Sequence, residues 1–140
     1  MRDKPHKIII DTNVWISFLI GLKTSSAIRS ILIDGSIEIV MTEILKSEIV
    51  AVASRPKFAR HFSPEACEHL LNFLCARSKD YPLNNIPKRC RDSKDDYLLE
   101  LARVADADIL ITGDKDLTEM HQFGHCRIMT LTEFNGKFSI

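Results

Sequence analysis

The chain has 140 residues, and its 19 Lys and Arg balance 19 Asp and Glu, so the formal net charge is zero. This length suits one domain with a sizeable hydrophobic core, and we predict a single domain over residues 1–140. The zero net charge excludes a global basic field for nucleic acid or anionic membrane, so any such contact must come from local clusters. No apolar stretch approaches the ~20 residues that cross a bilayer, and the four cysteines show no metal-ligand spacing. We therefore expect a cytoplasmic protein that makes no membrane contact.

Five elements are predicted in the first half of the chain. A β-branched run indicates a buried strand at 7–11, and a second apolar run indicates a strand at 37–41. Apolar periodicity and capping residues predict helices at 24–34, 42–54 and 64–77, the last with proline at its tolerated first position.

The second half continues the alternation. Prolines and asparagines make residues 78–91 mainly loop, although 81–83 could pair at a sheet edge. The remaining elements are, in order, a helix at 94–105, a strand at 108–112, a helical turn after Asp114, a strand at 127–130 and a turn at 131–134. Because strands alternate with helices, the sequence predicts an α/β fold with a parallel sheet covered on both faces.

Two carboxylates follow predicted strands. Asp11 ends the apolar run at 8–10, and Asp114 follows the run at 109–113. Ligands of open parallel sheets bind outside the carboxyl ends of the strands, so both acids are expected at the ligand-binding edge. Alternatively, Asp11 is an ordinary strand terminator and Asp114 belongs to an Asx turn.

A third acid interrupts the apolar face of the helix predicted at 42–54. Each helical residue advances ~100° around the axis, which places Glu48 roughly 40° from Ile44 and on the side of Val52. Glu48 is therefore a candidate for an inward-facing carboxylate. The alternative is a partly exposed acid at the rim of an amphipathic face.

Two adjacent acids begin the helix after the loop. Asp95 shares its face with Leu98 and Leu99, whereas Asp96 lies ~100° away and is expected to face outward. Asp96 also fits the S-x-x-D capping pattern that starts at Ser93. For Asp95 the alternative role is stabilisation of the helix dipole in the first turn.

Together these acids indicate an oxygen cage for a divalent metal, formed by Asp11, Glu48, Asp95 and Asp114. A carboxylate in a low-dielectric site costs several kcal/mol unless it is paired, protonated or bound to metal. Groups that could orient the carboxylates or metal-bound water are supplied by Thr12, Asn13 and Thr112.

Two local basic clusters stand near predicted helix ends. One contains Arg55, Lys57, Arg60 and His61, and the other contains Lys88, Arg89, Arg91 and Lys94. Most such clusters are solvated faces of a protein. Near a metal site, however, they could hold phosphates.

Four segments together closely resemble the PIN-domain family. They are I-I-I-D-T-N-V at 8–14, Glu48 followed by R-P-K-F at 55–58, C-R-D-S-K-D-D at 90–96 and I-T-G-D-K-D-L at 111–117. Within the family, the chain is similar from residue 7 to about 135 to toxin components of toxin–antitoxin systems, relatives of the VapC ribonucleases. The resemblance implies a three-layer α/β/α sandwich with a central, mainly parallel sheet.

The resemblance also implies metal-dependent cleavage of RNA by the four acids that the helix and strand geometry selects. The expected cation is Mg²⁺ or Mn²⁺, because the ligands are hard oxygens and no soft ligand set is present. Asp116 matches a position that is acidic in some relatives, and Asp96 is the alternative to Asp95. The partners implied are an RNA substrate, a cognate antitoxin and a second copy in a homodimer.

Other function classes share parts of this pattern. A haloacid-dehalogenase-like phosphatase would use Asp11 as nucleophile, but it requires a second Asp where Asn13 stands. A phosphoacceptor receiver domain is disfavoured because the first strand lacks an acidic pair. A catalytically silent PIN-like module that binds RNA or protein stays open.

Overall fold

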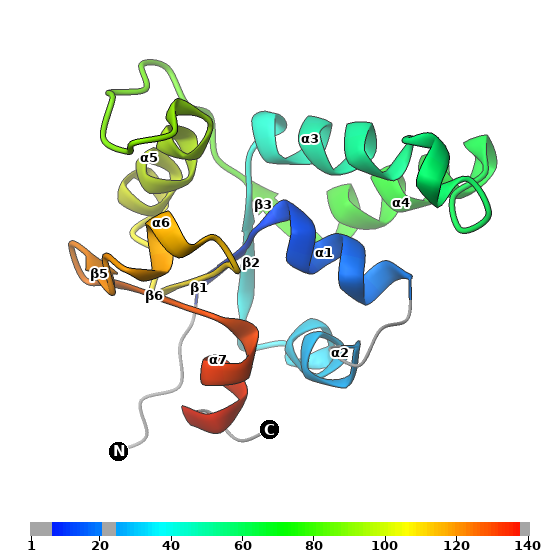
Figure 1. The fold of residues 1–140 in the computed structure, drawn as a ribbon. Helices are drawn as coiled ribbons and strands as arrows, with labels where there is room; N and C mark the ends of the chain where they lie inside the picture. The colour runs from blue at the N-terminus through cyan, green and yellow to red at the C-terminus, as the bar shows by residue number, and fades with distance from the viewer. Residues whose placement is uncertain (1–6, 21–24, 138–140) are drawn as a thin grey trace.

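The computed structural model describes residues 7–20 and 25–137, without the side chains of 25–27 (Figure 1). Within these residues, six strands form one sheet in the order β3-β2-β1-β4-β6-β5. Neighbouring strands are parallel except for β5 and β6. The strands are β1 Lys7–Ile10, β2 Glu38–Met41, β3 Ser78–Asp80, β4 Ile109–Ile111, β5 Gln122–Phe123 and β6 Cys126–Met129.

Helices cover both faces of this sheet. In Figure 1, α1 to α4 lie on one side and α5 lies on the other. The helices are α1 Thr12–Leu19, α2 Ser25–Ile33, α3 Glu43–Ala53, α4 Pro64–Arg77, α5 Asp96–Ala105, α6 Lys115–Thr118 and α7 Leu131–Lys137, with 3-10 turns η1 Pro56–Phe58 and η2 Ser93–Asp95. The α/β fold, with helices on both sides of a mainly parallel sheet, is therefore confirmed.

The core lies around the two central strands. The side chains at 8–10 in β1 and at 109–111 in β4 are fully buried. A strand covered on both faces needs a continuous apolar run, because alternate side chains enter opposite layers. Full burial of each such side chain stabilises the fold by roughly 1.5–3 kcal/mol.

Strand order also determines where a ligand can bind. From β1 the chain proceeds to β2 and β3 on one side, and then it returns to β4 on the other side of β1. Connections that reverse direction in this way open a crevice at the carboxyl ends of the two central strands. Asp11 follows β1 and Asp114 lies just beyond β4, so both stand at this crevice.

The helix α1 was not predicted. Its residues, T-N-V-W-I-S-F-L, are rich in β-branched and aromatic types, which have modest helix propensity. The helix forms because Asp11 caps it and because Trp15 is buried, with an edge-on contact to Phe18 at 6.4 Å between ring centroids. Asp11 is thus the N-cap of a helix as well as the end of a strand.

The sheet edges also differ from expectation. Strand β3 pairs with β2 through residues 78–80 rather than 81–83, because the chain enters the strand directly from α4. The two-residue strand β5 was not predicted, and α7 extends to Lys137 rather than ending at 134. Residue 24, the expected start of the second helix, lies outside the described residues. Within the described part of the chain, no helix has the length and apolar character needed to cross a membrane.

Candidate functional site

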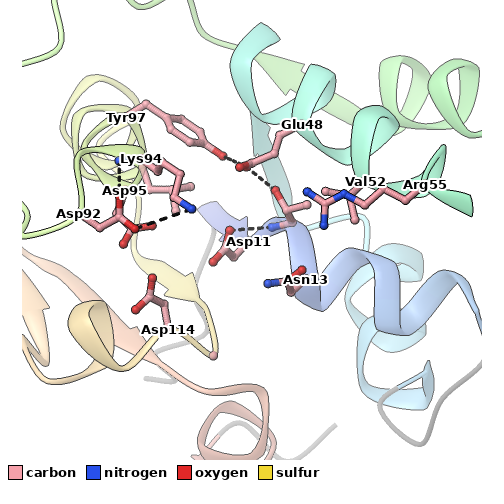
Figure 2. A pocket seen from close by; sticks show the side chains of 13 residues that line it. Asp11, Asn13, Glu48, Val52, Arg55, Asp92, Lys94, Asp95, Tyr97 and Asp114 are labelled. Atoms are coloured by element: carbon pink, nitrogen blue, oxygen red, sulfur yellow. Dashed lines mark hydrogen bonds and ion pairs between the residues drawn. The ribbon is translucent and has the colours of Figure 1, made fainter. Parts of the chain in front are cut away.

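A pocket of about 520 Å³ lies at the carboxyl edge of the sheet (Figure 2). The strand ends contribute Asp11 and Asp114, α3 contributes Glu48, and η2 contributes Asp95. The four acids that were predicted separately therefore line one pocket. Its complete lining is Asp11, Thr12, Asn13, Glu48, Val52, Arg55, Asp92, Lys94, Asp95, Tyr97, Leu98, Gly113 and Asp114.

Asp11 is held at both carboxylate oxygens. The backbone N–H of Thr12 donates to Oδ1 at 2.7 Å, and the hydroxyl of Thr112 donates to Oδ2 at 2.7 Å. The Thr112 hydroxyl oxygen also accepts from the N–H of Asp114 at 3.1 Å, so it links the two strand ends. Burial raises the pKa of Asp11, and the nearby carboxylates Glu48 and Asp114 raise it further, against the opposing effect of the two hydrogen bonds.

Glu48 is oriented by two hydroxyl groups. Thr12 Oγ1 and Tyr97 OH both donate to Glu48 Oε1, each at 2.6 Å (Figure 2). Burial, followed by the neighbouring Glu48, raises the pKa of Tyr97, so the phenol keeps its proton and serves as a donor. Both donors bind Oε1, so neither of them occupies the other carboxylate oxygen of Glu48.

Asp95 has a carboxylate oxygen that no hydrogen-bond donor satisfies among the described residues. This oxygen, Oδ2, is buried. Burial raises the pKa of Asp95 to about 7, with further contributions from Asp114, Asp11 and Asp92. A buried carboxylate oxygen without a donor is costly, and a bound cation would remove that cost.

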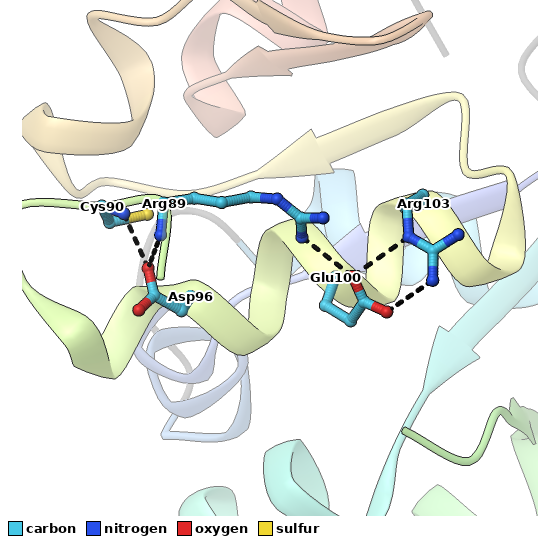
Figure 3. Close-up of polar contacts among 5 residues, drawn as sticks. All are labelled: Arg89, Cys90, Asp96, Glu100 and Arg103. Carbon is cyan, nitrogen blue, oxygen red and sulfur yellow. Dashed lines mark hydrogen bonds and ion pairs between the residues drawn. The ribbon is translucent and has the colours of Figure 1, made fainter. Parts of the chain in front are cut away.

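Asp96 is not exposed to solvent, contrary to the prediction that it faces outward. It is buried, and its Oδ1 accepts from the backbone N–H groups of Arg89 at 2.9 Å and Cys90 at 2.7 Å (Figure 3). The bond from Arg89 is the main reason that its pKa is lowered. The prediction failed because the loop before α5 folds back onto this side of the helix and covers Asp96, which helical periodicity does not reveal.

The expected capping box is absent as well. Asp92 caps η2 by accepting from Lys94 N–H at 3.0 Å, and the side chain of Asp95, the N-cap of α5, makes no capping bond. Asp96 does not line the pocket, so the structure places Asp95 rather than its neighbour with the other acids.

The secondary candidate Asp116 also lies outside the pocket lining. Its backbone N–H donates to Asp114 Oδ1 at 2.9 Å and so helps to cap α6. Of the three supporting residues, Thr12 and Asn13 line the pocket, and Thr112 lies behind it in contact with Asp11.

The acids are the ligand type that a hard divalent cation prefers, but they are not arranged as a complete metal-binding site. Among the described residues, no three His, Cys, Asp or Glu side chains are grouped closely enough to hold a metal ion. The donors are all oxygens, the buried Asp95 Oδ2 lacks a partner among the described residues, and neighbouring carboxylates help to raise the pKa of Asp11 and of Asp95. These features fit Mg²⁺ or Mn²⁺, which bind a few carboxylates and retain water.

Sequence reasoning missed Tyr97 and did not distinguish Arg55 and Lys94 within their clusters. Tyr97 carries no local signal, because its contact with Glu48 joins residues 49 positions apart. The clusters did identify basic segments near the site, but a cluster alone does not indicate which side chain enters a pocket.

A family model for the PIN domain matches residues 7–116, a range that includes the four predicted acids Asp11, Glu48, Asp95 and Asp114. The chain belongs to the PIN-domain family. PIN domains are generally nucleases, so the family supports hydrolysis of nucleic acid as the class of activity.

Two further comparisons concern individual proteins. No curated protein matches the chain. Among solved structures, the PIN domain of T. brucei RRP44 is similar at 15% sequence identity and a TM-score of 0.49, covering 96% of this chain and 81% of that chain.

Proposed function

We propose that this PIN domain is a metal-dependent endoribonuclease that hydrolyses phosphodiester bonds of RNA. The observation that carries the proposal is the meeting of Asp11, Glu48, Asp95 and Asp114 in one pocket, where a buried Asp95 oxygen lacks a donor. Acids that share a pocket repel one another, and a cation bound among them would relieve that repulsion.

The four acids would hold one or two Mg²⁺ or Mn²⁺ ions. A bound ion of this kind lowers the pKa of water and neutralises charge on the leaving oxygen of the phosphodiester. Thr112 and the Thr12 N–H orient Asp11, while Thr12 and Tyr97 orient Glu48, so the carboxylates are directed before any ligand arrives. In-line attack of water would leave 5′-phosphate and 3′-hydroxyl ends.

Two alternatives make different predictions. A phosphatase of the haloacid-dehalogenase type would hydrolyse p-nitrophenyl phosphate, although Asn13 stands where its second Asp is required. A silent PIN-like module would bind RNA without cleaving it. Both are tested by the experiment that follows.

The direct test compares wild type with Asp11→Asn on single-stranded RNA and on p-nitrophenyl phosphate. We expect cleavage of RNA alone, dependent on Mg²⁺ or Mn²⁺ and abolished by chelator. Asp11→Asn should reduce the rate more than ~100-fold, because loss of a metal ligand exceeds the effect of an outer contact. Its metal-free Tm should be unchanged or higher, since one repelling charge is removed. Full RNA cleavage by Asp11→Asn in metal-titrated assays would contradict the proposal.

We further propose that the protein is the toxin of a type II toxin–antitoxin pair and forms a homodimer. The support is the sequence resemblance to VapC relatives. An antitoxin could inhibit the enzyme by placing an Arg among the four acids, because a guanidinium matches carboxylate geometry bidentately. Inhibition by the product of a neighbouring gene should then weaken as Mn²⁺ is raised. Co-purification without inhibition would contradict this mechanism, and a monomeric mass by light scattering would remove the dimer.

A further inference from the structure

Two cations line the acidic pocket from different elements. Arg55 stands between α3 and η1, and Lys94 belongs to η2. Figure 2 shows Arg55 entering from the side of α3 and Lys94 from the side of α5. Nothing in the metal chemistry described above requires either side chain.

The pocket selects these two from the basic clusters of the sequence. Of the eight basic residues in those clusters, only Arg55 and Lys94 line the pocket. The Nζ atom of Lys57, two residues from Arg55, lies 5.1 Å from the centre of the Phe58 ring. Arg89 Nη1 donates to Glu100 Oε1 at 2.8 Å (Figure 3). The Arg89 guanidinium also lies over the ring of Phe123, 5.1 Å from its centre. Lys57 and Arg89 therefore make contacts outside the pocket.

Neither cation is committed to neutralising the acids. Among the described residues, no ion pair includes Arg55, although five carboxylates line the same pocket. Lys94 lies 3.8 Å from Asp92, and its side chain is 80% exposed. An exposed pair of this length is weak, so a phosphate can replace Asp92 as the partner of Lys94.

A nucleic-acid strand creates a need for cations at these positions. Each nucleotide carries a negative phosphate, and the acids of the pocket repel the phosphates that flank the one being cleaved. A pocket of about 520 Å³ has the size of a site for a small ligand, which favours an unstacked nucleotide of a single strand over a duplex. Arg presents a fork that binds phosphate bidentately, and Lys acts as a point charge.

We propose that Arg55 and Lys94 bind the phosphates on either side of the scissile phosphate and so hold a single nucleic-acid strand across the acids. This inference rests on the proposed nuclease function. The two residues position the substrate and take no part in bond cleavage. Phosphate contacts do not distinguish bases. The contribution of each residue to binding affinity should therefore be the same for oligonucleotides of different sequence.

The test measures binding without cleavage. Fluorescein-labelled 12-nucleotide oligouridine is titrated with the full chain in chelator over a series of NaCl concentrations, and anisotropy gives the binding constant. The variants are Arg55→Gln, Lys94→Gln and the double variant, with Lys57→Gln as a matched control outside the pocket and Arg55→Lys as the charge-retaining variant. Equal Tm values confirm that the folds are comparable.

We expect Arg55→Gln and Lys94→Gln each to reduce the slope of log K against log salt by about 0.7, and the double variant by about 1.4. Lys57→Gln and Arg55→Lys should keep the wild-type slope. With Mn²⁺ present, the first two variants should raise KM severalfold with little change in kcat, because binding lost equally from ground and transition states appears in KM. Oligoadenosine should lose affinity to the same extent.

Three results would overturn the inference: unchanged slopes in both pocket variants, an equal loss in Lys57→Gln, or no binding of the oligonucleotide by wild type at low salt. The two proposals fail separately. RNA cleavage with unchanged slopes removes the phosphate-binding role and leaves the nuclease. Reduced slopes without cleavage in any metal remove the nuclease and leave a strand-binding pocket.

Discussion

Asp95 and Asp96 are adjacent in the sequence but have different roles. Asp95 lines the pocket with an unpartnered buried oxygen, whereas Asp96 accepts two backbone N–H groups of the loop before it. Asp95 therefore belongs to the pocket, and Asp96 anchors the loop before the helix.

Asp95→Asn should therefore abolish RNA cleavage and leave Tm unchanged or higher. Asp96→Asn should lower Tm, because a neutral amide accepts the N–H groups of Arg89 and Cys90 less strongly than a carboxylate. Cleavage rates and melting curves of the two variants decide the matter. If Asp96→Asn were inactive at full stability, the assignment of the two acids would have to be exchanged.

Tyr97 should act on metal binding through Glu48. Removing its hydroxyl in Tyr97→Phe takes away one of the two donors to Glu48 Oε1. We expect the Mn²⁺ dissociation constant to rise about 10-fold, as for loss of an outer contact to a metal ligand. The free energy of unfolding should fall by about 0.5–1.5 kcal/mol. Calorimetric titration with Mn²⁺ and urea unfolding measure the two effects.

Tyr81 provides a matched control, because its hydroxyl donates to Glu38 and it does not line the acidic pocket. Tyr81→Phe should keep the wild-type affinity for Mn²⁺. Equal losses of Mn²⁺ affinity in both variants would indicate a general loosening of the fold rather than a specific effect on Glu48.

At the scale of elements, Arg77 joins the end of α4 to the end of α2. Its guanidinium donates to the carbonyl oxygens of Leu32 at 2.7 Å and of Ile31 and Asp34 at 3.4 Å. The last carbonyls of a helix have no partners within the helix, and their partial negative charge attracts a cation. This contact holds the two helices together directly before β3 begins.

Arg77→Met should lower the free energy of unfolding by about 1–3 kcal/mol, the range for losing hydrogen bonds from a charged donor. Arg60, an exposed residue in the turn after η1, is the control, and Arg60→Met should change stability by less than about 0.5 kcal/mol. Urea unfolding at neutral pH measures both. Equal effects would show that the contact between α4 and α2 contributes nothing measurable.

At the scale of the whole molecule, the pocket acids should make metal-free stability depend on pH. The pKa of Asp95 is raised to about 7 in the folded chain, whereas an aspartate in the unfolded chain ionises near 4. Between these values the unfolded chain releases the proton and the folded chain keeps it, so stability falls as pH rises from about 4 to about 7.

The measurement is the Tm of wild type and of Asp95→Asn across this pH range in chelator. The wild-type curve should fall relative to the variant, and the two should converge at low pH. Added Mn²⁺ should oppose the fall, with a stabilisation of about 2.7 kcal/mol at 100 times its dissociation constant. Parallel curves from pH 4 to 7 would show that Asp95 ionises normally.

The strand ends and the inward acids were predictable because their signals are local. Apolar runs identify β1 and β4, and parallel strands bring their carboxyl ends to one edge, so the sequence placed Asp11 and Asp114 at the same edge of the sheet. Helical periodicity identified Glu48 from its position among apolar neighbours. These inferences need only the geometry of a strand or of a single helix.

The tertiary structure alone decided which side chains meet around those acids. Tyr97 reaches Glu48 because α3 and α5 approach the same crevice, and Asp96 is buried because the preceding loop folds back onto it. Arg55 and Lys94 enter the pocket while the other residues of their clusters do not. Contacts of this kind depend on how elements that are far apart in the sequence pack together. Local periodicity shows only which face of one helix or strand is apolar, so it cannot predict these contacts.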